Sequence, residues 1–300
     1  MSVSLAKYFR TLRHASFSSW PTLLRKWAEA RREVLPPSRA EICEFPSIES
    51  YEKSYAQLAA ILGQSRKKPP PNEQSFLLRM KHRRAVYPGA LGLEDCYFLT
   101  AFAGILAPKR IVEIGTLTGF SAAVLAGALA RTHGDNASVR LDTIDTRAQC
   151  LVEETRPTGF EIAELVPELE SMVRVHVPHD SALVRQLAQR DELELVFIDA
   201  NHCHPYPLLD LLRLAPFTRR GGWTVLHDIR LGEPAGAQWL FESWPFRKIS
   251  GGNIGAIQLP PNKTVLIPFA LRLMSRPFEI TGARANRLRS ALLESLGNLA

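Results

Sequence analysis

The segment from Arg110 to Ala123, RIVEIGTLTGFSAA, constrains the fold more than any other part of the chain. Its first five residues include three with β-branched side chains, which predict a buried strand. Gly115 and Gly119 bracket a short turn, and the small residues from Ser121 onward predict a helix. A strand, a glycine turn and a helix in direct succession are typical of the first crossover in a nucleotide-binding α/β sheet.

The residues of the turn distinguish between classes of ligand. A dinucleotide site needs a further glycine where this chain has Thr116 and Leu117, and the lysine of a phosphate-binding loop is also missing. Glu113 would repel a pyrophosphate but suits a ligand with a cationic end. S-adenosylmethionine (SAM) has an ammonium and a sulfonium group and no phosphate. An ordinary strand-to-helix turn without a ligand is the alternative that this segment leaves open.

Two motifs resemble those of a known family. VEIGTLTGFSA resembles motif I of class I SAM-dependent methyltransferases, and its GFSA ending resembles the branch that methylates oxygen atoms of small molecules. FIDANH at 197–202 and GGWTVLHDI at 221–229 resemble the FIDGxH and GGxxxxHD motifs of a bacterial methyltransferase group that often acts on sugars or secondary metabolites. The two resemblances together cover about residues 91–258. They imply SAM as the cofactor and leave the acceptor open.

The predicted fold is an α/β, Rossmann-like, doubly wound and mostly parallel sheet. Strands are expected at the motif and at 139–145, 173–177, 193–199 and 223–229, with helices between them. Residues 246–249 and 254–258 predict an antiparallel hairpin at the C-terminal edge. We expect three regions, which are a basic helical N-terminal extension at 1–72, a SAM-binding methyltransferase domain at 73–262, and a C-terminal helical extension at 263–300.

The helix expected at 91–106 comes directly before the motif strand. In methyltransferases of this type, the helix in this position packs on the sheet and closes over the cofactor. Glu94 near its start either faces that pocket or lies exposed in the first turn.

The resemblance also implies a set of cofactor-binding residues. Asp145 ends the second strand, where a carboxylate can accept both ribose hydroxyls, whereas Asp142 points to the other face of the sheet. Asp180 and Ser181 match a polar position that contacts the adenine amino group, and they also suit the cap of a helix. The full predicted set is Glu113, Gly115, Thr116, Gly119, Ser121, Asp145, Asp180, Ser181 and Asp199.

The reacting groups are expected at the carboxyl ends of the fourth and fifth strands. Methyl transfer is an in-line displacement that brings the acceptor oxygen to roughly 3–3.5 Å from the methyl carbon and removes the hydroxyl proton. Asp199-x-x-His202 resembles the motif of metal-dependent sugar O-methyltransferases in which the histidine is the general base, and a free histidine pKa of about 6.5 suits that role. The alternative for His202 is a hydrogen bond to a backbone carbonyl at the start of a helix.

A divalent metal is a second open question. Asp199 and Asp228 resemble the two carboxylates that hold Mg²⁺ in catechol-type O-methyltransferases. Ile229 stands where that family has its third ligand, an asparagine. Mg²⁺ or another divalent metal therefore remains a prediction, with His202 or His227 as an alternative ligand. His204 is expected to be a loop residue.

Charge and cysteine content limit the partners. The formal net charge is +7, but residues 1–110 hold 18 Lys/Arg against 9 Asp/Glu, while 111–300 hold 19 against 21. The region of the motifs is therefore near neutral, and we expect no nucleic-acid partner. The four cysteines are far apart, which fits a reducing, cytoplasmic compartment. No apolar run reaches the roughly 18–20 residues that span a bilayer. Residues 1–34 predict basic amphipathic helices that contact a membrane surface, their own domain or a second copy in a homodimer.

The sequence therefore predicts an enzyme that transfers a methyl group from SAM to a hydroxyl of a small molecule, a sugar or a secondary metabolite. The alternatives are an N-methyltransferase or a cephalosporin-hydroxylase-like protein of the same fold, a non-catalytic scaffold at a membrane surface, and, least favoured, an NAD-dependent dehydrogenase. The choice of acceptor is expected to depend on His202, Asp228 and the helices at both ends of the chain.

Overall fold

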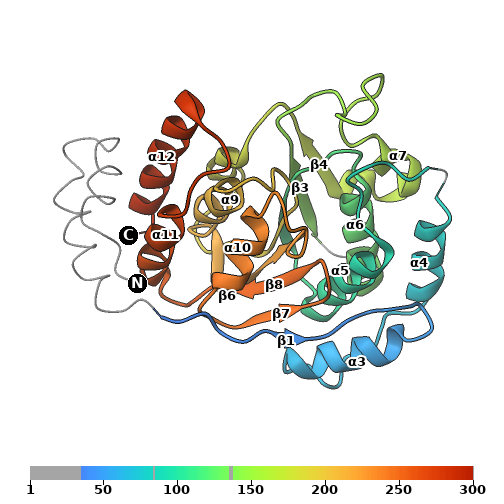
Figure 1. Cartoon of the computed structure of the whole chain (residues 1–300). Helices are drawn as coiled ribbons and strands as arrows, with labels where there is room; N and C mark the ends of the chain where they lie inside the picture. Colours follow the sequence, from blue (N-terminus) through green and yellow to red (C-terminus); the bar gives the residue numbers. More distant parts are fainter. Residues whose placement is uncertain (1–34, 84, 135–137, 300) are drawn as a thin grey trace.

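A computed structural model describes residues 35–83, 85–134 and 138–299. In these residues an eight-stranded sheet has the order β1-β7-β8-β6-β5-β2-β3-β4 (Figure 1). Only β8 in this sheet runs antiparallel to its neighbours, β6 and β7. The strands are β1 (Glu41–Ile42), β2 (Arg110–Ile114), β3 (Arg140–Ile144), β4 (Val173–His176), β5 (Leu193–Ile198), β6 (Thr218–Leu226), β7 (Lys248–Ser250) and β8 (Gly255–Gln258).

Helices cover both faces of the sheet (Figure 1). One layer holds α3 (Tyr51–Ile61), α4 (Glu73–Lys81), α5 (Leu93–Leu106), α6 (Phe120–His133) and α7 (Phe160–Leu165). The other holds α8 (Val184–Leu187), α9 (Tyr206–Leu214), α10 (Gly236–Ser243), α11 (Leu266–Met274) and α12 (Gly282–Gly297). The short 3₁₀ segments are η2 (Pro167–Met172), η3 (Ser181–Leu183) and η4 (Lys263–Val265).

The alternation of side chains along each strand builds a separate core on each face. Ile111 packs with α5 and α6, whereas the next residue, Val112, packs in the core beneath α9 and α12. Leu141 and Ile144 divide in the same way. Strands buried on both faces are apolar along most of their length, as expected in a parallel sheet.

The predicted fold class is confirmed, including the antiparallel hairpin and the C-terminal helices. Two details differ from the sequence prediction. Strand β6 begins at Thr218 instead of residue 223, because Thr218 pairs with Leu193 ahead of an irregularity in the β5–β6 register. Residues 219–222 therefore lie within the strand. The helix expected directly after Asp180 and Ser181 is a 3₁₀ turn followed by the single-turn α8.

The N-terminal segment contributes to the same core as the motifs. β1 pairs in parallel with β7 and thereby extends the sheet beyond the hairpin. The buried rings of Tyr51 and Tyr55 on α3 lie in the core that also contains α5 and α6. The boundary predicted at residue 72 therefore does not divide the core. The basic helices predicted at 1–34 lie outside the described residues. Within the described ranges, no helix is both long enough and apolar enough to span a bilayer.

Candidate active site

A cavity of about 730 Å³ opens at the carboxyl ends of β2, β3 and β5. Open α/β sheets bind ligands at this edge. The cavity is large enough for a nucleoside and a second small molecule. Its wall includes most of the predicted cofactor residues, namely Gly115, Thr116, Ser121, Asp145, Asp180, Ser181 and Asp199, together with His202.

The two motif glycines occupy positions that exclude a side chain. A Cβ on Gly115 would lie 2.0 Å from the backbone oxygen of Asp199, and the φ angle of Gly115 is +100°. Gly119 has φ +89°, and its Cβ would lie 2.9 Å from backbone atoms of Gly159. Only glycine tolerates both the crowding and the left-handed backbone. The turn therefore brings bare backbone to the cavity wall.

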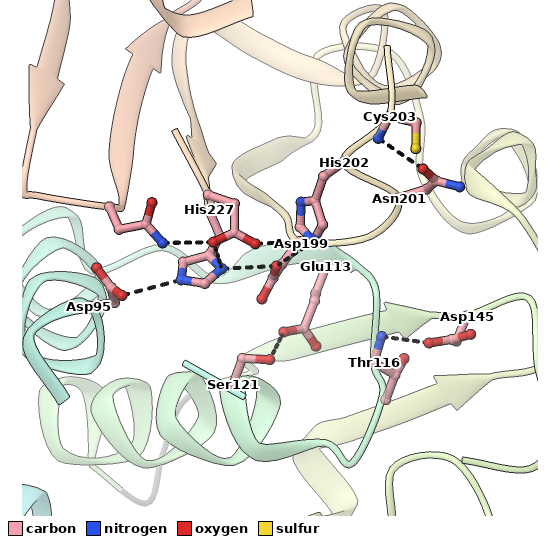
Figure 2. Close-up of polar contacts among 12 residues, drawn as sticks. Asp95, Glu113, Thr116, Ser121, Asp145, Asp199, Asn201, His202, Cys203 and His227 are labelled. Atoms are coloured by element: carbon pink, nitrogen blue, oxygen red, sulfur yellow. Dashed lines mark hydrogen bonds and ion pairs between the residues drawn. The ribbon is translucent and has the colours of Figure 1, made fainter. Parts of the chain in front are cut away.

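Glu113 lies behind the cavity wall, not on it. Its side chain is fully buried, and Ser121 Oγ donates a 2.5 Å hydrogen bond to its Oε1 atom (Figure 2). Burial raises the pKa of Glu113 to about 7, against the lowering effect of that hydrogen bond. Ser121 is the member of this pair that faces the cavity. Glu113 can therefore influence a ligand through Ser121 and through its charge.

Asp145 fixes the conformation of the glycine turn. One carboxylate oxygen accepts from the backbone N–H of Thr116 at 3.1 Å (Figure 2). The same oxygen accepts from the backbone N–H of Leu117 at 3.0 Å. The other accepts from the N–H of Arg147 at 3.0 Å. The carboxylate lines the cavity, so it is also placed to accept hydroxyls of a ligand.

Asp180 and Ser181 also line the cavity. Asp180 caps the 3₁₀ turn by accepting from the N–H of Ala182, which confirms the capping role considered from the sequence. Its other oxygen pairs with Arg213 at 2.9 Å. Ser181 Oγ donates to the buried carboxylate of Asp210 at 2.5 Å. The wall is polar and held in place by its own contacts.

The predicted reacting groups converge at one end of the cavity. His202 Nε2 lies 3.1 Å from Asp228 Oδ2 and 4.0 Å from Asp199 Oδ1. His227 Nδ1 lies 3.1 Å from that same Asp199 atom and 3.5 Å from Asp228 Oδ1 (Figure 2). Two histidines and two carboxylates from the ends of β5 and β6 therefore form one cluster.

The two histidines of this cluster have different surroundings. The side chain of His202 is 26% exposed and lines the cavity, whereas that of His227 is 7% exposed. Burial favours the neutral ring of His227, but the carboxylates of Asp199, Asp95 and Asp228 outweigh it and raise its pKa to about 11. The protonated ring of His227 is therefore favoured, and of the two histidines only His202 lines the cavity, where a ligand can reach it.

Comparison with known proteins identifies the central part of the chain. Residues 112–229 match a family model described as a methyltransferase domain. This part of the chain is a methyltransferase domain. The match spans both motifs, from β2 to the residue after Asp228, so the prediction of such a domain is confirmed.

Solved structures show more distant similarity. The O-methyltransferase TomG from Streptomyces achromogenes, involved in tomaymycin synthesis and solved with SAM, is 20% identical with a TM-score of 0.43, over 71% of this chain and 99% of that chain. An O-methyltransferase from Bacillus cereus in complex with SAH is 18% identical with a TM-score of 0.43, over 71% of this chain and 100% of that chain. No curated protein matches the chain.

The structure places two further residues in the cluster, both outside the matched range, that the sequence analysis did not single out. Asp95, in the first turn of α5, is 3.2 Å from His227 Nε2 through its Oδ2 atom. Asp95 is buried. The neighbouring Glu94 is exposed, which is one of the two alternatives that the sequence analysis gave for Glu94. The sequence shows Asp95 directly before an apolar run that starts at Cys96, and this position was the one signal available for it.

The second further residue of the cluster is Asn253, in the turn between β7 and β8. Its Nδ2 donates to Asp228 Oδ1 at 2.6 Å, and its Oδ1 accepts from the N–H of Arg230 at 3.1 Å. Its backbone oxygen accepts from the N–H of Ile229 at 3.0 Å. Asp228 has φ +57°, an unusual conformation for a residue other than glycine. Asn253 therefore holds Asp228 in a strained turn.

The donor set for a metal differs from the catechol-type pattern. Ligand atoms of Asp199, His202 and Asp228 lie within 4.8 Å of one another. Ile229 is buried in the core beneath α10 and cannot supply a ligand. Two carboxylates and one imidazole fit a divalent ion with mixed oxygen and nitrogen coordination. Such an ion would replace the present contact between His202 and Asp228.

Proposed function

We propose that this chain transfers a methyl group from SAM to a hydroxyl group of a small-molecule acceptor. The methyltransferase domain supplies the reaction class. The observation that carries the finer proposal is the cluster of Asp199, His202, His227 and Asp228, which adjoins a cavity of cofactor size.

Several features of the cavity support SAM as the cofactor. The turn from Gly115 to Gly119 exposes backbone, and Ser121 at its end is available to the methionine part of SAM. Asp145 supplies acceptor oxygens for ribose hydroxyls, while Asp180 and Ser181 offer polar groups for adenine. Bound there, SAM would supply an electrophilic methyl group on a sulfonium.

In this reaction the protein orients the acceptor and accepts the proton of its hydroxyl group. His202 lines the cavity, and its Nε2 contact with Asp228 stabilises the positive charge that the ring gains on protonation. Asp199, held by His227, places a carboxylate beside the same position. If SAM donates the methyl group, the bond between its sulfonium sulfur and the methyl carbon would break as the acceptor oxygen binds that carbon, SAH would be the leaving group, and the hydroxyl proton would pass to His202.

A metal and a general base make competing use of His202. If a divalent ion binds Asp199, His202 and Asp228, it lowers the pKa of the acceptor hydroxyl, and His202 is then a ligand and not a base. Chelation separates the two cases. Activity that survives chelator but is lost in His202→Ala supports the base, whereas activity lost with chelator and restored by Mg²⁺ or Mn²⁺ supports the metal.

Calorimetry with SAM and with NAD tests the cofactor directly. We expect SAM to bind in the micromolar range and NAD not to bind, and Asp145→Ala should weaken SAM binding about tenfold or more because it removes charge-assisted hydrogen bonds. SAH formation is then measured with sugars, catechols and matched amines as acceptors. A chain that does not bind SAM would refute the proposal, and binding without turnover on any acceptor would favour a non-catalytic scaffold.

A further inference from the structure

Helix α12 forms one wall of the cavity. Arg284, Arg287, Leu288 and Ala291 line it, which corresponds to one face of a helix at spacings of three, four and seven residues. The helix packs along α9 (Figure 1). The first residue of α9, Tyr206, lines the cavity together with His202. The C-terminal helix therefore reaches the cluster that we propose for methyl transfer.

Neither of the two α12 arginines, Arg284 and Arg287, forms an ion pair with an acidic side chain among the described residues. Arg284 Nε donates to the phenol oxygen of Tyr206 at 2.5 Å, and its guanidinium lies 5.3 Å from the centre of that ring. Arg287 makes no hydrogen bond or ion pair with any residue that the structure describes. Tyr206 offers a hydroxyl and not a carboxylate, so the described residues leave both guanidiniums without an anionic partner.

The acidic residues that line the cavity have partners other than the α12 arginines, and one of them, the buried Asp210, accepts from Ser181. Asp180 pairs with Arg213, and Asp199 is held by His227. Asp145 accepts from backbone N–H groups of the glycine turn. Glu279, near the start of α12, accepts from the backbone N–H groups of His204 and Ala235, and lies outside the cavity wall.

We infer that the acceptor carries an anionic group, a carboxylate or a phosphate, which binds Arg284 and Arg287 while its hydroxyl faces His202. This inference rests on the proposed function. A single exposed arginine is commonly a solvated surface residue. Two arginines one helical turn apart on a cavity wall can both donate hydrogen bonds to the same ligand. The planar guanidinium forms parallel hydrogen bonds with both oxygens of a carboxylate or phosphate.

A catechol acid and its neutral analogue provide the test. The chain loaded with SAH is titrated calorimetrically, at fixed ionic strength, with 3,4-dihydroxybenzoate, 3,4-dihydroxybenzyl alcohol and inorganic phosphate. We expect the acid to bind about tenfold more tightly than the alcohol, because two charge-assisted contacts are added. The Arg284→Gln/Arg287→Gln double variant should lose that preference while its affinity for the alcohol stays the same.

Arg289→Gln provides the matched control on the same helix. The guanidinium of Arg289 lies 4.7 Å from the centre of the Phe278 ring and is not part of the cavity wall. This variant should keep the preference for the acid. Tighter binding of inorganic phosphate than of the acid, lost in the double variant, would assign the site to a phosphate, and the reverse order would assign it to a carboxylate.

Two results would overturn the inference. The first is that the unmodified chain binds the acid and the alcohol with equal affinity, or binds neither detectably. The other is a loss of SAM affinity in the double variant, which would assign the arginines to the cofactor. SAM binding by the unmodified chain is measured in the same series. Its absence would refute the proposed function, whereas normal SAM binding without an anion preference refutes only the inference about the acceptor.

Discussion

Asp95 Oδ2 lies 3.2 Å from His227 Nε2, on the side of the ring opposite the contact between Nδ1 and Asp199. The relationship connects α5, which precedes the glycine motif, with the strands that carry the reacting groups. Because both ring nitrogens have a carboxylate partner, the ring cannot rotate without losing a charged contact. Asp95 therefore positions Asp199 through His227.

Replacing Asp95 by asparagine should lower kcat about tenfold, because one charge-assisted hydrogen bond that holds His227 is weakened. SAM affinity should not change, since Asp95 is not part of the cavity wall. Initial rates of SAH formation and calorimetry measure the two effects separately. Glu94→Gln, at the exposed neighbouring position, is the control and should behave like the unmodified chain. An unaltered kcat in Asp95→Asn would contradict the positioning role.

Asn253→Ala should release Asp228 from its left-handed conformation. The variant loses the hydrogen bonds from Nδ2 to Asp228 and from the Arg230 N–H to Oδ1, so stability should fall by about 1–3 kcal/mol. Activity should fall about tenfold or more, since a misplaced group near the reaction is costly. Urea unfolding and initial rates provide the measurements.

Asn262→Ala separates the two effects of that substitution. Asn262 Oδ1 likewise accepts two hydrogen bonds, from the N–H and the hydroxyl of Thr264, at the start of η4. Its removal should lower stability without lowering kcat. If both variants lose activity in proportion to stability, Asn253 has only a structural role.

The sequence predicted the sheet and the cavity wall well because these depend on local patterns. β-branched runs define the strands, and Gly115 and Gly119 sit where the backbone geometry excludes other residues. Asp145, Asp199 and Asp228 were each assigned to a strand end, and because parallel strands end at one edge, the structure places them around one cavity and its adjoining cluster.

Contacts between distant segments could not be predicted in this way. Asn253 sits in a hairpin turn, where asparagine is common, and nothing near it in the sequence indicates Asp228 as a partner. β1 is two residues long and depends wholly on pairing with β7. In the sequence, the arginines of α12 have the pattern of an ordinary charged helix face. Only the packing of α12 on α9 places Arg284 and Arg287 at the cavity.

Gly115→Ala should abolish SAM binding and destabilise the chain. The added Cβ would overlap the backbone oxygen of Asp199, and backbone cannot move aside as a flexible side chain can. The strain should cost about 1–3 kcal/mol or more. Gly297→Ala, where the new Cβ meets no atom within 4 Å, is the control and should leave both SAM affinity and stability nearly unchanged. Normal SAM affinity in Gly115→Ala would show that the turn is not the cofactor site.

His204 should make the folded chain sensitive to acid. Its ring is fully buried and packs edge-on against Trp239 and Phe278 at centroid distances of 5.3 and 5.4 Å. Burial lowers its pKa to about 4, against the opposing charge of Glu279. An unfolded histidine titrates near pH 6.5, so between about pH 6.5 and 4 the unfolded chain binds more protons than the folded chain. His204 therefore removes stability as the pH falls through that range.

His204→Phe keeps the ring packing and removes the titrating group. Its stability relative to the unmodified chain should rise as the pH falls from 7 to 4.5, by an amount on the order of 2–3 kcal/mol. Urea unfolding at several pH values measures this difference, which also cancels the titration of the other buried groups. His82→Gln, on the exposed surface at the end of α4, should show no such trend. A constant difference between His204→Phe and the unmodified chain across this range would mean that the folded protein accommodates a protonated His204 without cost.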